Sequence, residues 1–331
     1  MSTPTPATGN ADLVRVSDLR VRFVTKETTV YAVNGVDFSL APGEVLGILG
    51  ESGCGKTVTL RALIRLLPED RAQVSGRVVV GDNDMLRLPK RELQSVRGGT
   101  IAMIFQEPMT ALDPVYTVGY QIAETIIRHE GCSWREADVR ALDLFEQVQV
   151  PSPKRRLNSY PHELSGGLRQ RAMIALALSC RPSVLLADEP TTALDATVQI
   201  QILLLLRELQ KELGMGVIFV THDMGVAGEI SDRLAIMYAG RLVETGPVTQ
   251  VMRAPLHPYT AGLLSSTVHG SMRGQRLQAI EGAPPNLEKL PDACSFVPRC
   301  PHVRDACREG VPEPVQAAPE RMARCIRVNP A

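Results

Sequence analysis

The sequence has no excess of charge of either sign. It contains 36 Lys and Arg residues against 36 Asp and Glu residues, so its formal net charge is zero, and no long block carries one sign. A protein that binds nucleic acid normally has a basic surface. We therefore expect no nucleic-acid partner.

A long hydrophobic run is also missing. Two of the most apolar stretches, Val45–Leu49 and residues 200–206, are far shorter than the roughly 20 residues of a membrane-spanning helix. Residues 1–12 are polar and rich in Pro, Thr and Ala, without the basic and apolar regions of a signal peptide. We expect these residues to be disordered, and any role at a membrane to depend on partner proteins.

The hydrophobic pattern changes along the chain. Residues 13–40 alternate between apolar and polar side chains, which predicts half-buried antiparallel strands. Val45–Leu49 is wholly apolar and predicts a buried strand, followed by a Gly-rich turn and a helix over residues 56–67, which Pro68 ends. Residues 118–150 are helical in period.

Further along, strands and helices alternate. Residues 184–187 and 217–220 are apolar β-type runs separated by a helical stretch over residues 197–213, the order typical of a parallel α/β sheet. Residues 234–238 and 241–244 flank a turn and predict a hairpin. After about Pro247 the sequence becomes Pro-rich and irregular, so a boundary is expected there.

The Gly-rich turn has the Walker A pattern, Gly50-Glu-Ser-Gly-Cys-Gly-Lys-Thr57, and lies between a predicted strand and a predicted helix, as that motif requires. Its glycines let backbone N–H groups converge on phosphate oxygens, Lys56 can reach the β and γ phosphates, and Thr57 can bind magnesium. The expected ATP-binding residues of this turn are Gly50, Ser52, Gly53, Cys54, Gly55, Lys56 and Thr57.

Two carboxylates end the predicted strand at residues 184–187. Asp188 is placed to hold magnesium, directly or through water, and Glu189 can act as the general base that polarises the attacking water. The pair is informative because a Walker A turn accompanies it.

Leu164-Ser-Gly-Gly-Leu-Arg-Gln170 resembles the signature sequence of ABC ATPases. In that family, residues matching Ser165, Gly166 and Gly167 contact the γ-phosphate of ATP held by the opposite subunit, so a working site needs two ATPase chains. Leu168 replaces the usual Gln, a mild departure since the phosphate-facing residues remain.

Other residues match the same family in order along the chain. The resemblance implies that Gln106 contacts magnesium and the attacking water, that His222 contacts the γ-phosphate, and that Ala193-Leu-Asp195 forms the D-loop. Tyr31 lies 25 residues before Lys56, where the family carries the aromatic that stacks on adenine.

The C-terminal part resembles the tail of ATPase subunits of bacterial oligopeptide and dipeptide importers and their nickel-importer relatives. The matching segments are His257-Pro-Tyr-Thr260, Glu281-Gly-Ala-Pro-Pro-Asn-Leu287 and Cys294-Ser-Phe-Val-Pro-Arg-Cys300-Pro. The resemblance implies a P-loop NTPase fold of the α/β class, with an antiparallel β subdomain, a helical subdomain at about residues 107–170 and a small irregular C-terminal extension. We expect the ATPase domain at residues 13–246 and the extension at 247–331, with one cassette because no internal repeat is present.

Four of the seven cysteines, Cys294, Cys300, Cys307 and Cys325, lie in the last 38 residues. Some relatives with this tail hold a 4Fe–4S cluster, which is the expectation here, with zinc or free thiols as alternatives. The absence of a Cys-x-x-Cys pair disfavours common zinc modules.

The resulting hypothesis is an ATP- and Mg²⁺-dependent importer motor for peptides at the cytoplasmic face of the bacterial inner membrane. Its expected partners are a second, different ATPase chain, two transmembrane permeases and an extracytoplasmic solute-binding protein. One alternative is a soluble ABC ATPase acting on ribosomes or DNA. The other is a non-catalytic partner subunit that binds ATP, against which intact Glu189 and His222 argue.

Overall fold

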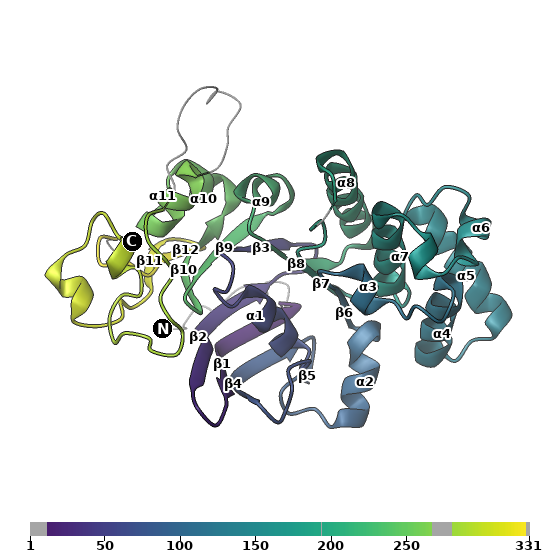
Figure 1. Ribbon diagram of the computed structural model, residues 1–331, viewed down its shortest axis with the longest axis horizontal. Coiled ribbons are helices and arrows are strands. Elements are labelled where there is room, and N and C mark those ends of the chain that lie inside the picture. Colours follow the sequence, from purple (N-terminus) through teal and green to yellow (C-terminus); the bar gives the residue numbers. More distant parts are fainter. Residues whose placement is uncertain (1–11, 193, 267–279, 329–331) are drawn as a thin grey trace, which may run out of the picture.

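The computed structural model describes residues 12–192, 194–266 and 280–328. Within these ranges the strands form two sheets, a smaller antiparallel one and a larger mixed one, with a helical lobe at one end of the larger sheet and the C-terminal tail at the other (Figure 1). Of residues 1–12, which the sequence predicts to be disordered, residues 1–11 lie outside the described part of the chain.

The smaller sheet has the strand order β2-β1-β4-β5. Its strands are β1 (Val14–Val24), β2 (Thr29–Leu40), β4 (Ala72–Val80) and β5 (Asn83–Asp84). β1 pairs with β2 antiparallel, from Val14 opposite Leu40 to Val24 opposite Thr29. The antiparallel strands predicted over residues 13–40 are therefore confirmed, and the apolar positions of their alternation, such as Leu19 and Val21, are buried.

The larger sheet has the order β11-β12-β10-β9-β3-β8-β7-β6. Its strands are β3 (Val45–Leu49), β6 (Ile101–Ile104), β7 (Val184–Asp188), β8 (Gly216–Thr221), β9 (Arg233–Tyr238), β10 (Arg241–Pro247), β11 (Val315–Ala318) and β12 (Arg321–Ala323). The run from β9 to β6 is parallel, as predicted. β3, β7 and β8 are buried along their whole length, which explains why they read as continuous apolar runs.

Four helices pack against the two sheets. They are α1 (Lys56–Leu63), α2 (Lys90–Gly99), α8 (Ala196–Leu213) and α9 (Met224–Ile230). The helix predicted over residues 56–67 ends early, at Leu63, because Arg65 adopts a left-handed backbone conformation with φ of 50°.

The lobe at the β6 edge consists of helices. They are α3 (Pro108–Ala111), α4 (Val118–Glu130), α5 (Trp134–Gln147), α6 (Pro153–Leu157), η1 (Pro161–Glu163) and α7 (Gly166–Leu178). The helical region predicted over residues 118–150 is two helices, because Gly131 turns left-handed with φ of 69° and Ser133 begins α5 with a capping box.

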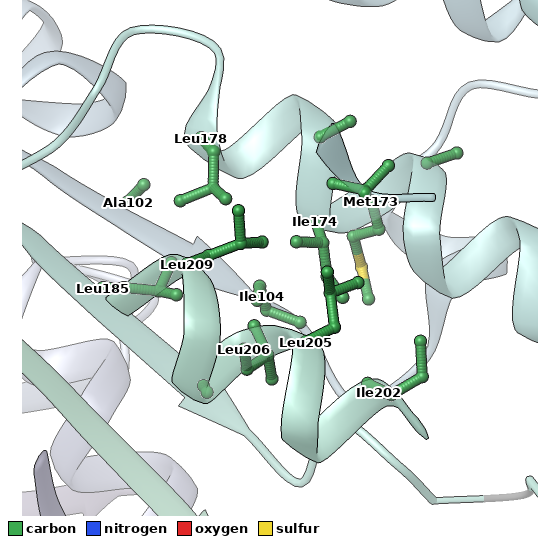
Figure 2. Packing of buried hydrophobic residues seen from close by; sticks show 14 of the residues in the cluster. Ala102, Ile104, Met173, Ile174, Leu178, Leu185, Ile202, Leu205, Leu206 and Leu209 are labelled. Atoms are coloured by element: carbon green, nitrogen blue, oxygen red, sulfur yellow. The ribbon is translucent and has the colours of Figure 1, made fainter. Parts of the chain in front are cut away.

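One apolar cluster joins this lobe to the sheet (Figure 2). Met173, Ile174 and Leu178 of α7 pack with Leu205 and other residues of α8 over the apolar side chains of β6 and β7. Both helices begin next to residues that the sequence assigns to the ATP site, since Ser165 caps α7 and Asp195 caps α8.

The tail consists of short helices and a two-stranded extension of the larger sheet. Its helices are α10 (Val248–Arg253), α11 (Pro258–Ser265), η2 (Val297–Arg299) and η3 (Asp305–Arg308). β12 pairs antiparallel with β10, and Arg321 of β12 forms an ion pair of 3.0 Å with the fully buried Glu244 of β10. The tail is thus packed onto the ATPase sheet, while the predicted boundary at residue 247 stays a prediction.

Candidate nucleotide-binding site

The phosphate-binding turn lies between β3 and α1. Gly55 has φ of 110°, and a Cβ there would lie 2.4 Å from the Ala32 carbonyl oxygen, so only glycine fits. Lys56 is buried, and its ammonium donates to the carbonyls of Gly50 at 2.8 Å and Glu51 at 3.1 Å. Its charge is therefore held inside the turn, where a phosphate group would lie.

A metal site is suggested where this turn meets the end of β7. The Thr57 hydroxyl donates to Asp188 Oδ1 at 2.9 Å, whereas Asp188 Oδ2 is buried without a hydrogen-bond partner. Burial raises the pKa of Asp188, against the opposing effect of the Thr57 hydrogen bond. A buried carboxylate oxygen beside a hydroxyl is a donor set that suits Mg²⁺, so these two residues fit the expected ion.

Three side chains converge on a single oxygen of Glu189. Glu189 Oε2 lies 3.3 Å from Gln106 Nε2, 3.1 Å from the Thr192 hydroxyl and 3.3 Å from His222 Nδ1. The residues come from the ends of β6, β7 and β8, which are neighbouring parallel strands. The structure thus brings the three predicted catalytic residues, Gln106, Glu189 and His222, together.

Glu189 also has a strained backbone. Its φ is 44°, a left-handed conformation that costs a non-glycine residue about 1 kcal/mol. Its N–H donates to the Val220 carbonyl of β8 at 3.0 Å. This bond ties the start of the loop after β7 to the neighbouring strand and so aims the carboxylate.

The signature residues lie elsewhere in the chain. Ser165 caps α7, its hydroxyl accepting from the Leu168 N–H at 3.4 Å, and Gly166 and Gly167 form the first turn. Figure 1 shows α7 and α1 on different parts of the molecule. The chain alone therefore does not bring its signature to its own phosphate-binding turn.

The remaining predicted site residues lie at the start of α8 and on β2. Asp195 caps α8 and accepts from the Val198 N–H at 3.0 Å, while Ala193 of the predicted D-loop lies outside the described residues. Tyr31, on β2, is 38% exposed, which leaves its ring open to solvent.

Thr192 and two contacts from the tail were not predicted from the sequence. Thr192 follows Glu189 by three residues, and this spacing alone carries no chemical signal. The Glu51 carboxylate forms an ion pair with Arg299, and the Glu51 N–H donates to the Tyr259 hydroxyl. Nothing in the sequence links residues this distant.

The prediction of a 4Fe–4S cluster is wrong, and so is its zinc alternative. Within the described residues no group of three or more Cys, His, Asp or Glu side chains is arranged to hold a metal ion. The four tail cysteines do line one cavity of about 20 Å³, room for about one water. Burial raises the thiol pKa of Cys294 and Cys300.

Comparison with known families agrees with the site. Residues 33–192 match the model described as "ABC transporter", and residues 243–307 match "Oligopeptide/dipeptide transporter, C-terminal region". The chain is 45% identical to the oligopeptide transport ATP-binding protein OppD of Salmonella typhimurium, over 98% of this chain and 96% of that protein. It is 46% identical to the dipeptide transport ATP-binding protein DppD of Bacillus subtilis, over 89% and 88%. Neither name mentions an iron–sulfur cluster.

Solved structures share the fold. A dimeric structure of the ATP-binding cassette MJ0796 in a post-hydrolysis state with ADP and Pi has a TM-score of 0.64 and 29% identity, covering 71% of this chain and 98% of that one. This chain therefore belongs to the family of ABC transporter ATP-binding proteins. Within that family it belongs to the oligopeptide/dipeptide importer group, and the predicted fold, ATPase class and importer function are confirmed.

Proposed function

We propose that this chain hydrolyses Mg·ATP with Glu189 as the general base, and that this reaction powers peptide uptake. The main support for this proposal is that Gln106, Thr192 and His222 all lie against Glu189 Oε2. A general base must be aimed at its water, and the Gln106 amide and the Thr192 hydroxyl both donate to one oxygen of Glu189, which leaves the other oxygen to accept the proton.

The phosphate-binding turn and the residues around it have separate roles in the proposal. The amides of residues 53–57 and Lys56 would bind the phosphates, Thr57 and Asp188 would hold magnesium, and Tyr31 would stack on adenine. Bound magnesium would neutralise charge on the phosphates. Gln106 and His222 would orient the water and the γ-phosphate, so this chain's contribution is positioning and charge compensation.

The working unit in this proposal is a dimer of cassettes. Ser165, Gly166, Gly167 and Asp195 lie apart from the phosphate-binding turn in one chain, so they would complete the site of a second chain placed face to face. The dimeric form of the related cassette MJ0796 supports this arrangement. We propose a second ATPase chain of different sequence as the partner.

The proposed membrane partners are two permease subunits, supplied with solute by an extracytoplasmic binding protein, at the cytoplasmic face of the inner membrane. Among the described residues, no helix has the length and apolarity needed to cross a bilayer. An apolar cavity of about 270 Å³ opens between α2 and the helical lobe, lined by Leu66, Met103, Phe105 and Met173 among others. A short helix from a permease would fit such a groove.

An exposed aromatic stack lies on the same lobe. Tyr120 stacks on Tyr116 with ring centroids 4.9 Å apart and on Trp134 at 5.2 Å. Exposed aromatic residues are enriched at protein interfaces, and these three side chains are our second candidate for the permease contact.

Reconstitution of the complete importer in proteoliposomes tests the function. Glu189→Gln should retain ATP binding and lower ATP hydrolysis and peptide uptake by at least about a hundredfold. If uptake continues at the wild-type rate, the partner ATPase performs the reaction and this chain is a non-catalytic subunit.

A further inference from the structure

Glu51, the second residue of the phosphate-binding turn, is held by an arginine from the tail. Arg299 Nη1 lies 2.6 Å from Glu51 Oε2, and Nη2 lies 2.9 Å from Oε1. This two-pronged geometry fixes both partners, since each nitrogen faces one carboxylate oxygen. The Arg299 side chain is 3% exposed and that of Glu51 is 26% exposed, so solvent screens the pair only in part.

A second tail residue holds the backbone of Glu51. The Glu51 N–H donates to the hydroxyl of Tyr259 at 2.9 Å. Tyr259 is fully buried, and its ring lies 4.5 Å from that of Tyr238 on β9. This packing holds the hydroxyl in place. Its hydrogen bond then holds the backbone of Glu51, near the start of the phosphate-binding turn.

Arg299 is itself held by the tail and the sheet. Its guanidinium donates to the carbonyls of Ile280 at 3.2 Å and Glu281 at 3.0 Å, and it lies 5.9 Å from the ring centroid of Tyr238. An arginine with this many fixed partners cannot swing away from Glu51 without breaking several contacts.

The same part of the tail also contacts β2, the strand that carries Tyr31, which is expected to stack on adenine. The N–H of Tyr31 donates to the Leu287 carbonyl at 2.9 Å. Residues 280–299 therefore contact both ends of the proposed ATP site, at Tyr31 and at Glu51.

We infer that Arg299 and Tyr259 are positioning residues for ATP binding, so that the C-terminal tail sets the nucleotide affinity of the ATPase. Arg299 acts through Glu51, whose carbonyl in turn accepts from Lys56. It also neutralises a carboxylate that would otherwise repel a triphosphate bound to the same turn. The inference rests on the proposed function, because it concerns the same ATP site.

Binding of Mg·ATP to the purified full-length chain tests the inference. Arg299→Met should raise the Kd for Mg·ATP about tenfold, because it leaves an unpaired carboxylate beside the site. Arg299→Lys should recover part of the affinity, since it restores the charge without the two-pronged geometry. The double variant Glu51→Gln with Arg299→Met should bind better than Arg299→Met alone, because the repelling charge is gone.

The kinetic signature separates positioning from general loss of structure. In the reconstituted importer, Arg299→Met should raise the KM for ATP about tenfold and leave kcat within about twofold of wild type. Tyr259→Phe, which keeps the ring packing, should raise KM about threefold.

Arg324→Ala is the matched control. Arg324 is a partly buried arginine in the same tail, but its guanidinium donates to the Pro312 carbonyl within the tail. Its removal should leave the Kd and KM unchanged.

Two results would overturn the inference: an Arg299→Met protein whose Kd stays within twofold of wild type, or an equal rise in Arg324→Ala. Both presuppose that the wild-type chain binds ATP. A wild-type chain that neither binds nor hydrolyses ATP contradicts the proposed function instead, so the two failures are distinguishable.

Discussion

The Thr57 hydroxyl donates to Asp188 Oδ1 across 2.9 Å, while Oδ2 of the same carboxylate has no partner. This contact joins the phosphate-binding turn after β3 to the end of β7, which lie 131 positions apart in the chain. A buried carboxylate with one free oxygen is costly without a cation, and this cost leads to the first prediction.

Asp188→Asn should raise the stability of the protein and lower its ATPase activity. Without Mg·ATP, the variant should be more stable than wild type by about 1 kcal/mol, because it removes a buried charge. Its ATPase rate should fall by at least about a hundredfold, because an amide is a poor magnesium ligand. Urea unfolding and phosphate release measure the two quantities, and a less stable variant would contradict our account of Asp188.

Stability should depend on pH through His257, the buried N-cap of α11. Burial lowers its pKa to about 4, whereas an unfolded histidine has a pKa near 6.5. The unfolded chain therefore binds the proton more readily, so this contribution is complete above about pH 6.5 and is lost as the pH falls toward 4. The loss can reach about 3 kcal/mol.

The charged groups near His257 must be considered in the same measurement. Glu244 accepts the His257 N–H and is ion-paired with Arg321. His257→Asn keeps a cap and removes the titration, so its unfolding free energy should decrease less than that of wild type between about pH 7 and pH 4.5. Parallel curves for the two proteins would show that His257 is not the titrating group.

Thr192 should contribute to the reaction rate through Glu189. Thr192→Ala removes the hydroxyl that donates to Glu189 Oε2, so kcat should fall about three- to tenfold while the Kd for ATP stays the same. Thr192→Ser keeps the hydroxyl and should retain most of the rate. A serine variant as slow as the alanine variant would mean that the methyl group, and not the hydrogen bond, matters.

Cys54 in the phosphate-binding turn should react slowly with alkylating reagents. Burial raises the pKa of its thiol, opposed by the charge of Lys56, and the thiolate is the reactive form. Complete modification should abolish ATP binding, since a Cβ at Gly50 would already lie 2.7 Å from Cys54 Sγ and the turn has no room for an adduct. Mass spectrometry reports modification, and full ATPase activity of a fully modified chain would refute the steric argument.

Much of the ATP site could be predicted because its chemistry is local in sequence. Glycines at fixed spacing, a lysine and a strand ending in two carboxylates occur in short segments, and the strand pattern predicts where they lie. The convergence of Gln106 and His222 on Glu189 could be expected from resemblance, but the donor Thr192 could not, because a single threonine has no distinctive pattern.

The wrong prediction concerns the four tail cysteines, and its cause is also physical. Clustering in sequence brings the thiols to one cavity, but ligation needs converging thiolates and room for the metal. Burial and side-chain packing decide both conditions, and neither can be derived from spacing.

The sequence by itself determined the phosphate-binding turn, the two carboxylates after β7 and the alternation of strands and helices, because these depend on residue type and short-range periodicity. Only the tertiary structure decided that Arg299 and Tyr259 of the tail hold Glu51, and that the signature at the start of α7 lies away from the turn. Contacts between residues hundreds of positions apart follow from how the sheet and tail pack, and that packing is a property of the whole chain.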